Sequence, residues 1–441
     1  MTSNVPPRAA ARTWLSVFLA ANVVLVTVFF FAGGVSDRPL ISAGRLAGLY
    51  AAQAMAFQLL LVARLPWLDR RLGMDRLTSL HRWTGFGLLW LLVAHVVFVV
   101  FGYAGLENHN PADEIIVLAN TLEGILRAIV AFVLILVVGA ASARFARRRM
   151  AYETWHFVHL YAYAAVLLAF THQVAVGQSF AGSVLARTYW WTLWLGAGAA
   201  VLAGRVVLPL WRNVRHQFRV VAVVPESADT VSVYISGRDL DLLPARAGQF
   251  FLWRFLTRDR WWQANPFSLS AAPDGQTLRL TAKAVGESSA KLRTLPVGTR
   301  VFAEGPYGAF TTLHQQLPNA LLIAGGVGIA PIRALLEDIA GHVVVLYRIR
   351  TPDDAVLLPE LQEIAKARGA IVYVLSGPSD LRGAHGPVLG PESLYALVPD
   401  IAERDVFVCG PPGMTAAVLR SVRELGVPGP RVHAERFSLA A

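Results

Sequence analysis

Hydrophobic residues dominate the first half of the chain in stretches of nearly constant length. Six apolar stretches of about 20 residues each occur at roughly 14–33, 43–63, 83–103, 117–140, 155–176 and 189–210. A helix rises about 1.5 Å per residue, so each stretch is long enough to cross the hydrocarbon core of a bilayer. The first stretch is longer than the apolar core of a signal peptide, and five more follow it. The pattern therefore predicts six transmembrane helices.

The pattern changes near residue 216, where short stretches replace the long ones. Strands broken by Gly, Pro and Asp predict a small antiparallel barrel, at 218–224, 231–236, 249–255, 278–284 and 300–304. Beyond residue 318, strands alternate with helices and predict a parallel sheet, at 320–324, 331–340, 343–349, 359–366, 371–376, 405–409 and 414–425. The predicted fold class is a multidomain membrane protein with a six-helix transmembrane bundle (1–213), an antiparallel β-barrel domain (216–316) and an α/β parallel-sheet domain (318–441).

Arginine placement predicts the orientation of the six helices. Eleven arginines lie at the N-terminus or in the turns after the second and fourth stretches, against four on the opposite side. Basic residues gather on the cytoplasmic side of membrane proteins, so both termini are expected in the cytoplasm of a multi-pass plasma-membrane protein. Topology thus accounts for the formal net charge of +11. No interleaving of basic and aromatic residues indicates binding to nucleic acid.

Composition narrows the possible chemistry. Of the 441 residues, 55% are hydrophobic and 16% charged, whereas soluble domains have about 45–50% and about 25%. This composition therefore argues against a soluble globular protein. Because Cys409 is the one cysteine, an internal disulfide, a thiolate zinc site and a Cys₄ iron–sulfur cluster are excluded as well. Any metal or redox centre must use histidine or a bound organic cofactor.

Histidines mark the third and fifth stretches, where ionisable groups are costly and usually functional. His81 and His95 are separated by 14 residues, about 21 Å of helix rise. His159 and His172 are separated by 13 residues, about 19.5 Å. The two helices run in the same direction, so the spacing predicts two haems, one above the other. His81 and His159 would be the axial ligands of the inner haem, and His95 and His172 those of the outer haem.

Two points of this histidine assignment stay open. On an ideal helix, 13 residues leave the His159 and His172 side chains about 140° apart. We therefore expect a bend, a π-bulge or differently rotated haem planes. His156 is the rival of His159, although it lies about 24 Å below His172, a poorer match in height. The alternative is that these histidines only form hydrogen bonds between helices.

The barrel part contains two motifs that suit a flavin nucleotide, composed of Asn265, Pro266, Phe267 and Ser268, and of Gly286, Ser288 and Ser289. An aromatic residue followed by a hydroxyl can lie on an isoalloxazine ring and donate a hydrogen bond to its edge. Hydroxyls and N–H groups at a helix start can hold a pyrophosphate. Plain N-capping is the alternative for the second motif.

Two glycine-containing turns follow strands of the predicted parallel sheet, and their residues are Gly325, Gly326 and Gly328 in the first and Cys409, Gly410, Pro411 and Met414 in the second. Glycines allow a tight turn and the close approach of a phosphate-bearing ligand. The strand–turn–helix setting of both turns predicts a dinucleotide site.

The order of these motifs is similar to that of the ferredoxin–NADP reductase superfamily. Joined to six spans with paired histidines, the whole chain resembles the ferric reductase and NADPH oxidase family, in a bacterial form. The resemblance implies bound FAD, two b-type haems, and NADPH or NADH as substrate. It also implies that Phe267 and Ser268 contact the flavin while Ser288 and Ser289 hold the FAD pyrophosphate.

The resemblance extends to the nucleotide site. It implies that the three glycines of the first turn line the phosphates, that Cys409 lies near the nicotinamide, and that Phe437 covers the flavin until nicotinamide displaces it. Position 265 departs from the family, where relatives often have His or Arg in place of Asn265. Arg348 and Arg350 are the candidates for reading a 2′-phosphate.

The resulting expectation is a membrane-embedded oxidoreductase. It would pass electrons from cytoplasmic NAD(P)H through FAD and both haems to a small extracytoplasmic acceptor, either oxygen, giving superoxide, or ferric iron. No residue is expected to act as an acid or base. One alternative is a membrane-anchored flavin reductase that serves a cytoplasmic partner. Another is a haem-bearing subunit that feeds a dedicated protein acceptor.

Overall fold

The computed structural model describes residues 8–147, 149–150, 152–177, 183–378, 380, 382–384 and 386–435. The chain forms two compact units. One comprises Arg12–Leu65 and Asp75–Arg205, and the other comprises Pro66–Met74 and Val206–Ala440 together with the N-terminal residues.

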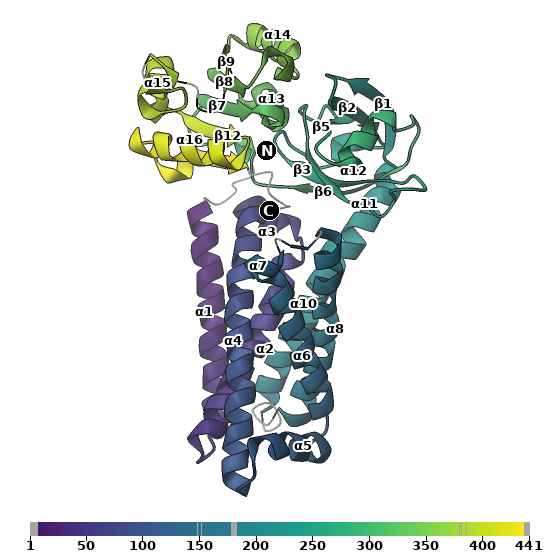
Figure 1. Ribbon diagram of the computed structural model, residues 1–441, viewed down its shortest axis with the longest axis vertical. Coiled ribbons are helices and arrows are strands. Elements are labelled where there is room, and N and C mark those ends of the chain that lie inside the picture. Colours follow the sequence, from purple (N-terminus) through teal and green to yellow (C-terminus); the bar gives the residue numbers. More distant parts are fainter. Residues whose placement is uncertain are drawn as a thin grey trace. The chain divides into compact units, whose positions relative to one another are not determined.

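The first unit is a bundle of long apolar helices (Figure 1). Its helices are α1 (Arg8–Ala32), α2 (Pro39–Val62), α4 (Met74–Glu107), α5 (Pro111–Thr121), α6 (Ile125–Ser142), α7 (Arg144–Arg147), α8 (Tyr152–Val176) and α10 (Val184–Leu202). Among the described residues, six helices are long and apolar enough to cross a membrane. The sixth of these continues from α10 through a π-helical turn, Ala203–Val207, into α11 (Leu208–His216). The six predicted transmembrane helices are confirmed.

Small residues bring α2 and α4 close together. A Cβ added at Gly44 would lie 2.8 Å from a Val99 methyl, and one added at Gly102 would lie 2.7 Å from the Ile41 side chain. Close backbone approach of this kind is a common way for membrane helices to associate, because lipid offers no hydrophobic driving force. The approach places the histidine-bearing helix α4 directly against α2.

The second unit begins with six antiparallel strands: β1 (Arg219–Pro225), β2 (Thr230–Ser236), β3 (Phe250–Phe255), β4 (Asn265–Ser268), β5 (Thr277–Lys283) and β6 (Val301–Tyr307). They form two sheets in the orders β1-β2-β5 and β4-β3-β6. Single bridges join the sheets at both edges, between Arg219 and Arg300 and between Leu269 and Leu280. The six strands therefore form two three-stranded antiparallel sheets, which pack around buried aromatic residues such as Trp253 and Phe251.

A five-stranded parallel sheet follows, in the order β13-β12-β7-β8-β9. Its strands are β7 (Ala320–Gly325), β8 (Val343–Ile349), β9 (Ile371–Ser376), β12 (Asp405–Cys409) and β13 (Val432–Glu435). Its helices are α13 (Ile329–Asp338), α14 (Leu358–Arg368), α15 (Pro391–Leu397) and α16 (Pro412–Glu424). Every residue of β7 is buried, because alternate side chains pack against α13 and α14 on one face and against α15 and α16 on the other. The predicted α/β arrangement is confirmed.

Short elements complete the unit: α3 (Pro66–Leu72), α12 (Glu287–Ala290), β10 (Arg382–Gly383) and β11 (Gly386–Pro387). Helix α3 contacts the loop after β6, where Asp69 Oδ2 accepts a 2.7 Å hydrogen bond from the Gly308 N–H. Helix α11 contacts β6 itself, since the Asn213 amide pairs with both the N–H and the C=O of Ala303 at 2.8 Å. These two helices hold β6 and the loop that ends the barrel.

Candidate functional site

The four predicted haem ligands form two ring pairs between α4 and α8. The ring centroids of His81 and His159 are 6.0 Å apart, and those of His95 and His172 are 6.5 Å apart. Each imidazole nitrogen would lie about 2 Å from a metal, and the ring centre about 1 Å farther back. Two rings on opposite sides of one iron therefore have centroids about 6 Å apart. The observed separations match this geometry at both levels.

The pairing bears on both open points of the histidine assignment. Because His81 lies against His159, the geometry favours His159 over His156; the Trp155 ring contacts both of these histidines and does not distinguish them. Helix α8 is α-helical from Tyr152 to Val176, so it contains no π-bulge between its two histidines. The ring planes are instead inclined by 67° in the inner pair and 54° in the outer pair.

Neighbouring groups orient the rings. His95 Nδ1 lies 2.8 Å from the Gly44 carbonyl, so Nδ1 carries the proton and Nε2 keeps the lone pair that a metal needs. A Cβ added at Gly48 would lie 2.6 Å from the same ring nitrogen, so only glycine leaves room for the ring. His159 Nδ1 lies 3.3 Å from Ser142 Oγ.

The surroundings of the four rings suit a metal that a cofactor already holds in part. His81 Nδ1 and His172 Nδ1 are buried without a hydrogen-bond partner, which is costly for an imidazole that only fills space. In the described part of the chain, no group of three or more His, Cys, Asp or Glu could hold a bare metal ion. A porphyrin supplies four nitrogens of its own and needs only two imidazoles, so these residues fit haem.

The two flavin motifs lie together in the barrel. Ser288 Oγ is 2.7 Å from Gln263 Oε1 and 3.1 Å from Asn265 Oδ1, which joins the start of β4 to α12. Ser268 is buried at the end of β4, while Phe267 is half-buried and its carbonyl accepts a 3.1 Å hydrogen bond from Trp253 Nε1. The predicted phosphate and ring contacts are therefore brought to one edge of the barrel.

Ser289 has a local role as well. Its hydroxyl accepts hydrogen bonds from the N–H groups of Val285 and Gly286 at 3.0 and 3.2 Å and donates to the Gly286 carbonyl. It thus fastens the turn before α12. Gly286 has open space where a Cβ would be, and Pro266 is exposed on β4.

The two glycine turns meet at the carboxyl ends of β7 and β12, which pair in register from Ala320 with Asp405 to Ala324 with Cys409. A Cβ at Gly328 would lie 2.3 Å from the Cys409 carbonyl oxygen, and one at Gly325 would lie 2.5 Å from Met414 Sδ and 2.9 Å from Pro411 Cδ. The Cβ of a residue at position 410 would be 3.1 Å from the Gly325 Cα. Close packing of the two turns therefore requires these glycines.

Gly326 and Cys409 have surroundings unlike those of the closely packed glycines: one is open and the other is fully buried. Gly326 has φ +54° and open space around it, as expected of a turn that leaves room for a ligand. Cys409 is fully buried, and burial followed by the nearby Glu435 charge raises the pKa of its thiol. The thiol is therefore neutral and acts as a small apolar side chain rather than a nucleophile.

The two arginine candidates have different surroundings. Arg348, on β8, donates to the Leu375 carbonyl at 2.9 Å and also to the carbonyls of Ile349 and Pro378. Burial, and then the charge of Arg350, lowers the pKa of Arg348. Arg350 itself is exposed just beyond the strand. Phe437 lies outside the described residues.

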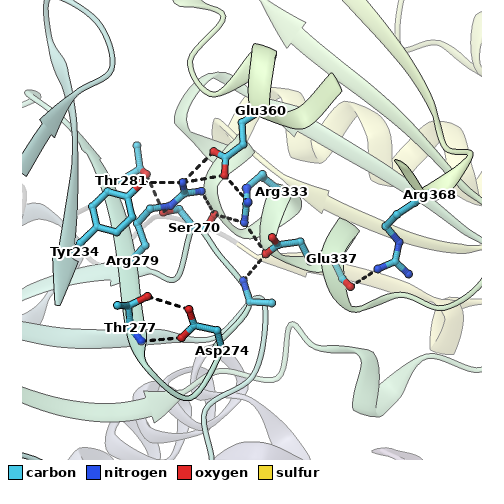
Figure 2. A network of polar contacts seen from close by, with 11 residues as sticks. Tyr234, Ser270, Asp274, Thr277, Arg279, Thr281, Arg333, Glu337, Glu360 and Arg368 are labelled. Carbon is cyan, nitrogen blue, oxygen red and sulfur yellow. Dashed lines mark hydrogen bonds and ion pairs between the residues drawn. The ribbon is translucent and has the colours of Figure 1, made fainter. Parts of the chain in front are cut away.

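Sequence reasoning missed a buried ionic network between the barrel and the parallel sheet (Figure 2). Arg279, on β5, donates to both carboxylate oxygens of Glu360 at 3.0 and 2.9 Å. Arg333, on α13, donates to the same carboxylate and, at 2.5 Å, to Glu337. Arg279 lies between Leu278 and Leu280 and so points outward from the barrel. A polar side chain in such a position is normally exposed to solvent, so no local signal in the sequence identifies this network.

Comparison with known proteins places both parts of the chain. Residues 47–170 match the family described as ferric reductase like transmembrane component, and residues 322–420 match the oxidoreductase NAD-binding domain. Ferredoxin–NADP reductase B of Sorangium cellulosum is 34% identical over 189 residues, which cover 39% of this chain and 77% of that protein. A flavohemoprotein of Pseudomonas putida is 32% identical over 241 residues, covering 52% of this chain and 61% of the relative.

Among solved structures, the FAD/NAD-binding domain of a nitric oxide dioxygenase from Vibrio cholerae is 24% identical, with a TM-score of 0.42 over 50% of this chain and 98% of that chain. The family matches and the relatives support a multi-pass membrane oxidoreductase that binds FAD and NAD(P)H. The chain therefore belongs to the ferric reductase and NADPH oxidase-like family, in which a ferric reductase-like transmembrane domain is fused to a ferredoxin–NADP reductase-type module.

Proposed function

We propose that this protein passes electrons from cytoplasmic NAD(P)H through FAD and two b-type haems to an extracytoplasmic acceptor, either oxygen, giving superoxide, or ferric iron. The observation that supports the proposal is the pairing of His81 with His159 and of His95 with His172, at centroid separations of 6.0 and 6.5 Å. Two imidazole levels about 20 Å apart along one helix suit electron carriage across a bilayer.

The cofactors supply the redox chemistry: FAD accepts a hydride and gives up single electrons, and haem with two imidazoles carries one electron with no open iron position. The chain's part is to hold and orient them. Gly44 fixes the tautomer of His95 through its carbonyl, and Gly48 leaves room for that ring. No acid or base is needed among the residues of the site.

In the second unit we assign Phe267 and Ser268 to the flavin ring and Ser288 to the FAD pyrophosphate, with Asn265 beside it. The smaller Asn265 amide replaces the cation that relatives often have there. Ser289 supports the same turn by fastening its backbone.

For the nicotinamide dinucleotide, we assign the phosphates to the turn Gly325–Gly328 and the nicotinamide to the end of β12 near Cys409. Arg350 is the better candidate for a 2′-phosphate, because the guanidinium of Arg348 already donates to three backbone carbonyls. A tenfold or greater preference for NADPH over NADH that Arg350→Ala abolishes would support this assignment.

The proposed topology places both termini in the cytoplasm and the protein in the plasma membrane. The proposed domains are a haem-binding bundle (1–213), a FAD-binding barrel (216–316) and an NAD(P)H-binding domain (318–441). The arginine distribution supports this orientation.

The test is the reduced-minus-oxidised absorption spectrum of the purified protein. We expect a b-type signal that His95→Ala and His159→Ala each weaken by about half, since each removes an axial ligand from one of the two haems. His156→Ala is the matched control on the same helix and should leave the signal unchanged. A protein with bound FAD and no haem signal would refute the proposal in favour of a membrane-anchored flavin reductase.

The acceptor is identified by a second assay. Purified protein reconstituted in vesicles is given NADPH on the cytoplasmic side, and superoxide or ferrous iron is measured on the other. Steady turnover with either acceptor supports the proposal. A haem that NADPH reduces but neither acceptor oxidises would indicate a subunit that feeds a dedicated protein acceptor.

A further inference from the structure

The network in Figure 2 joins the two halves of the proposed hydride-transfer site by a short path. Ser270 lies two residues after Ser268, at the flavin edge of the barrel. Its carbonyl accepts hydrogen bonds from Arg279 at 2.6 Å and from Arg333 at 3.3 Å. Arg333 lies on α13, five residues after Gly328, the last glycine of the proposed phosphate turn. One hydrogen bond therefore links the flavin strand to the helix that begins at the nucleotide turn.

Further bonds make this link rigid. The Ala272 N–H donates to Glu337 Oε2 at 2.7 Å, and Arg333 donates to the same oxygen at 2.5 Å. Glu360, at the start of α14, receives both guanidinium groups. The segment that follows the flavin strand is thus held by two helices of the nucleotide-binding part.

The network is buried on its cationic side. The side chains of Arg279 and Arg333 are 5% and 6% exposed, and Ser270 is fully buried. Tyr234 and Thr281 close the barrel side, with the tyrosine hydroxyl 3.3 Å from Arg279 and the threonine hydroxyl 2.8 Å from Ser270 Oγ. Buried ion pairs are weak contributors to stability but can fix one arrangement among several, because each misplacement leaves a charge without its partner.

A second ion pair between the barrel and the parallel-sheet part is exposed, unlike the buried network. Lys283, at the end of β5, lies 3.2 Å from Asp354, with the two side chains 36% and 31% exposed. Exposed pairs of this kind contribute little and tolerate rearrangement. The chain therefore offers an exposed ion pair as a matched control for the buried one.

We propose that Arg333, bound to Glu360 and to the Ser270 carbonyl, is a positioning residue that sets the distance between the nicotinamide and the flavin. This inference rests on the proposed function only in assigning the hydride step to these two motifs. In that step the C–H bond of the reduced nicotinamide breaks, its electron pair and hydrogen pass to the flavin, the nicotinamide is oxidised and the flavin is reduced. Such a transfer requires the reacting atoms about 3–3.5 Å apart, and a misplacement of about 1 Å costs up to about a hundredfold in rate.

The test uses full-length holoprotein in detergent and anaerobic stopped-flow measurement of flavin absorbance after mixing with NADPH. Arg333→Met keeps an unbranched apolar stem, shorter than that of arginine, and removes every donor. We expect the rate constant at saturating NADPH to fall about 10- to 100-fold, while the half-saturating NADPH concentration and the FAD dissociation constant change less than about threefold. Arg333→Lys should recover part of the rate. In Lys283→Met, NADPH should reduce the flavin at the wild-type rate.

A second route to reduced flavin separates positioning from general damage. Dithionite reduces the flavin without nicotinamide, so in Arg333→Met the later transfer from flavin to an added acceptor should keep its wild-type rate. Loss of FAD affinity, or equal slowing of the NADPH and dithionite routes, would show a merely structural role and overturn the proposal. An unchanged hydride rate in Arg333→Met would also overturn it.

The test also covers a variant that fails to fold and a protein that holds no haem. If Arg333→Met does not fold, Glu360→Gln takes its place, because it keeps the shape of the acceptor and removes the charge that both arginines share. The same loss of rate at unchanged FAD affinity is then expected, and an unchanged rate overturns the proposal. Flavin reduction is observed directly, so absence of haem would refute the proposed function while leaving this measurement intact.

Discussion

The packing of the two glycine turns allows the effect of a single methyl group to be worked out. In Gly328→Ala the new Cβ would lie 2.3 Å from the Cys409 carbonyl oxygen and 3.0 Å from the Gly410 nitrogen. These atoms are backbone atoms of a neighbouring strand and turn, so no side chain can swing away to relieve the clash. The turn after β7 or the end of β12 must move by roughly 1 Å.

The cost of this movement can be estimated from overpacked cores, where forced backbone shifts cost about 1–3 kcal/mol. For a unit of this size, each kcal/mol lowers the melting temperature by about 2–4 °C. Because the clash lies at the proposed phosphate site, we expect NADPH affinity to fall by about tenfold or more, which corresponds to about 1.4 kcal/mol.

Two neighbouring glycines provide matched controls. Gly413 has no atom within 4 Å of an added Cβ and lies at the start of α16, so Gly413→Ala should not destabilise the protein. Gly326→Ala meets no atom either, but its φ of +54° costs an alanine about 1 kcal/mol. It should therefore have an intermediate effect on stability.

The assays are a thermal melt of the purified protein, an NADPH titration and a measurement of bound FAD. The barrel does not contain the clash, so FAD content should stay at the wild-type level in all three variants. If Gly328→Ala melted and bound NADPH like Gly413→Ala, the close approach of the two turns would be refuted.

Three other measurements test separate features. Since burial and the Glu435 charge raise the pKa of the Cys409 thiol, iodoacetamide at about pH 8.5 should leave the folded protein unmodified and label one thiol after denaturation; labelling of the folded protein would contradict this. Asp405→Ala removes a buried carboxylate that contacts His433 at 2.7 Å and accepts two backbone hydrogen bonds, so urea denaturation should show a loss of about 3 kcal/mol. A loss below about 1 kcal/mol would show that the pair is not buried. Asp69→Asn keeps an acceptor for the Gly308 N–H and should preserve bound FAD, whereas Asp69→Ala should lower FAD retention in gel filtration; equal retention would refute a role for α3 in holding the loop after β6.

The features predicted correctly from sequence are those that a short segment determines by itself. Apolar length alone predicts a spanning helix, and the structure has six of them among its described residues. Their ends depend on finer signals. The stretch predicted at 117–140 is in fact two helices, α5 and α6, because Gly124 takes a φ of +83° between them.

Elements at the end of the parallel sheet were harder to predict. Strand β13 (Val432–Glu435) was not predicted, since its alternation of apolar and polar residues extends over only four positions, the lower limit at which alternation indicates a strand. Its His433 is buried because Asp405 and the Phe407 ring, on the neighbouring β12, lie 2.7 Å from its Nε2 and 4.3 Å from its ring centre. A partner 28 residues away thus decides that this segment is a strand.

The same dependence on distant partners explains why the ionic network escaped sequence reasoning. On β5, Leu278 and Leu280 point into the barrel, so the alternation assigns Arg279 and Thr281 to its outer face, where polar side chains normally meet solvent. Both are nevertheless buried, because α13 and α14 contribute Arg333 and Glu360 to this face. Glu360, the ionic partner of Arg279, follows it by 81 residues, and Arg333, which shares that carboxylate, follows it by 54 residues. Both separations are beyond any periodic signal. A polar residue buried on the outside of a barrel therefore indicates a docked neighbour, and here that neighbour brings the nucleotide-binding turn with it.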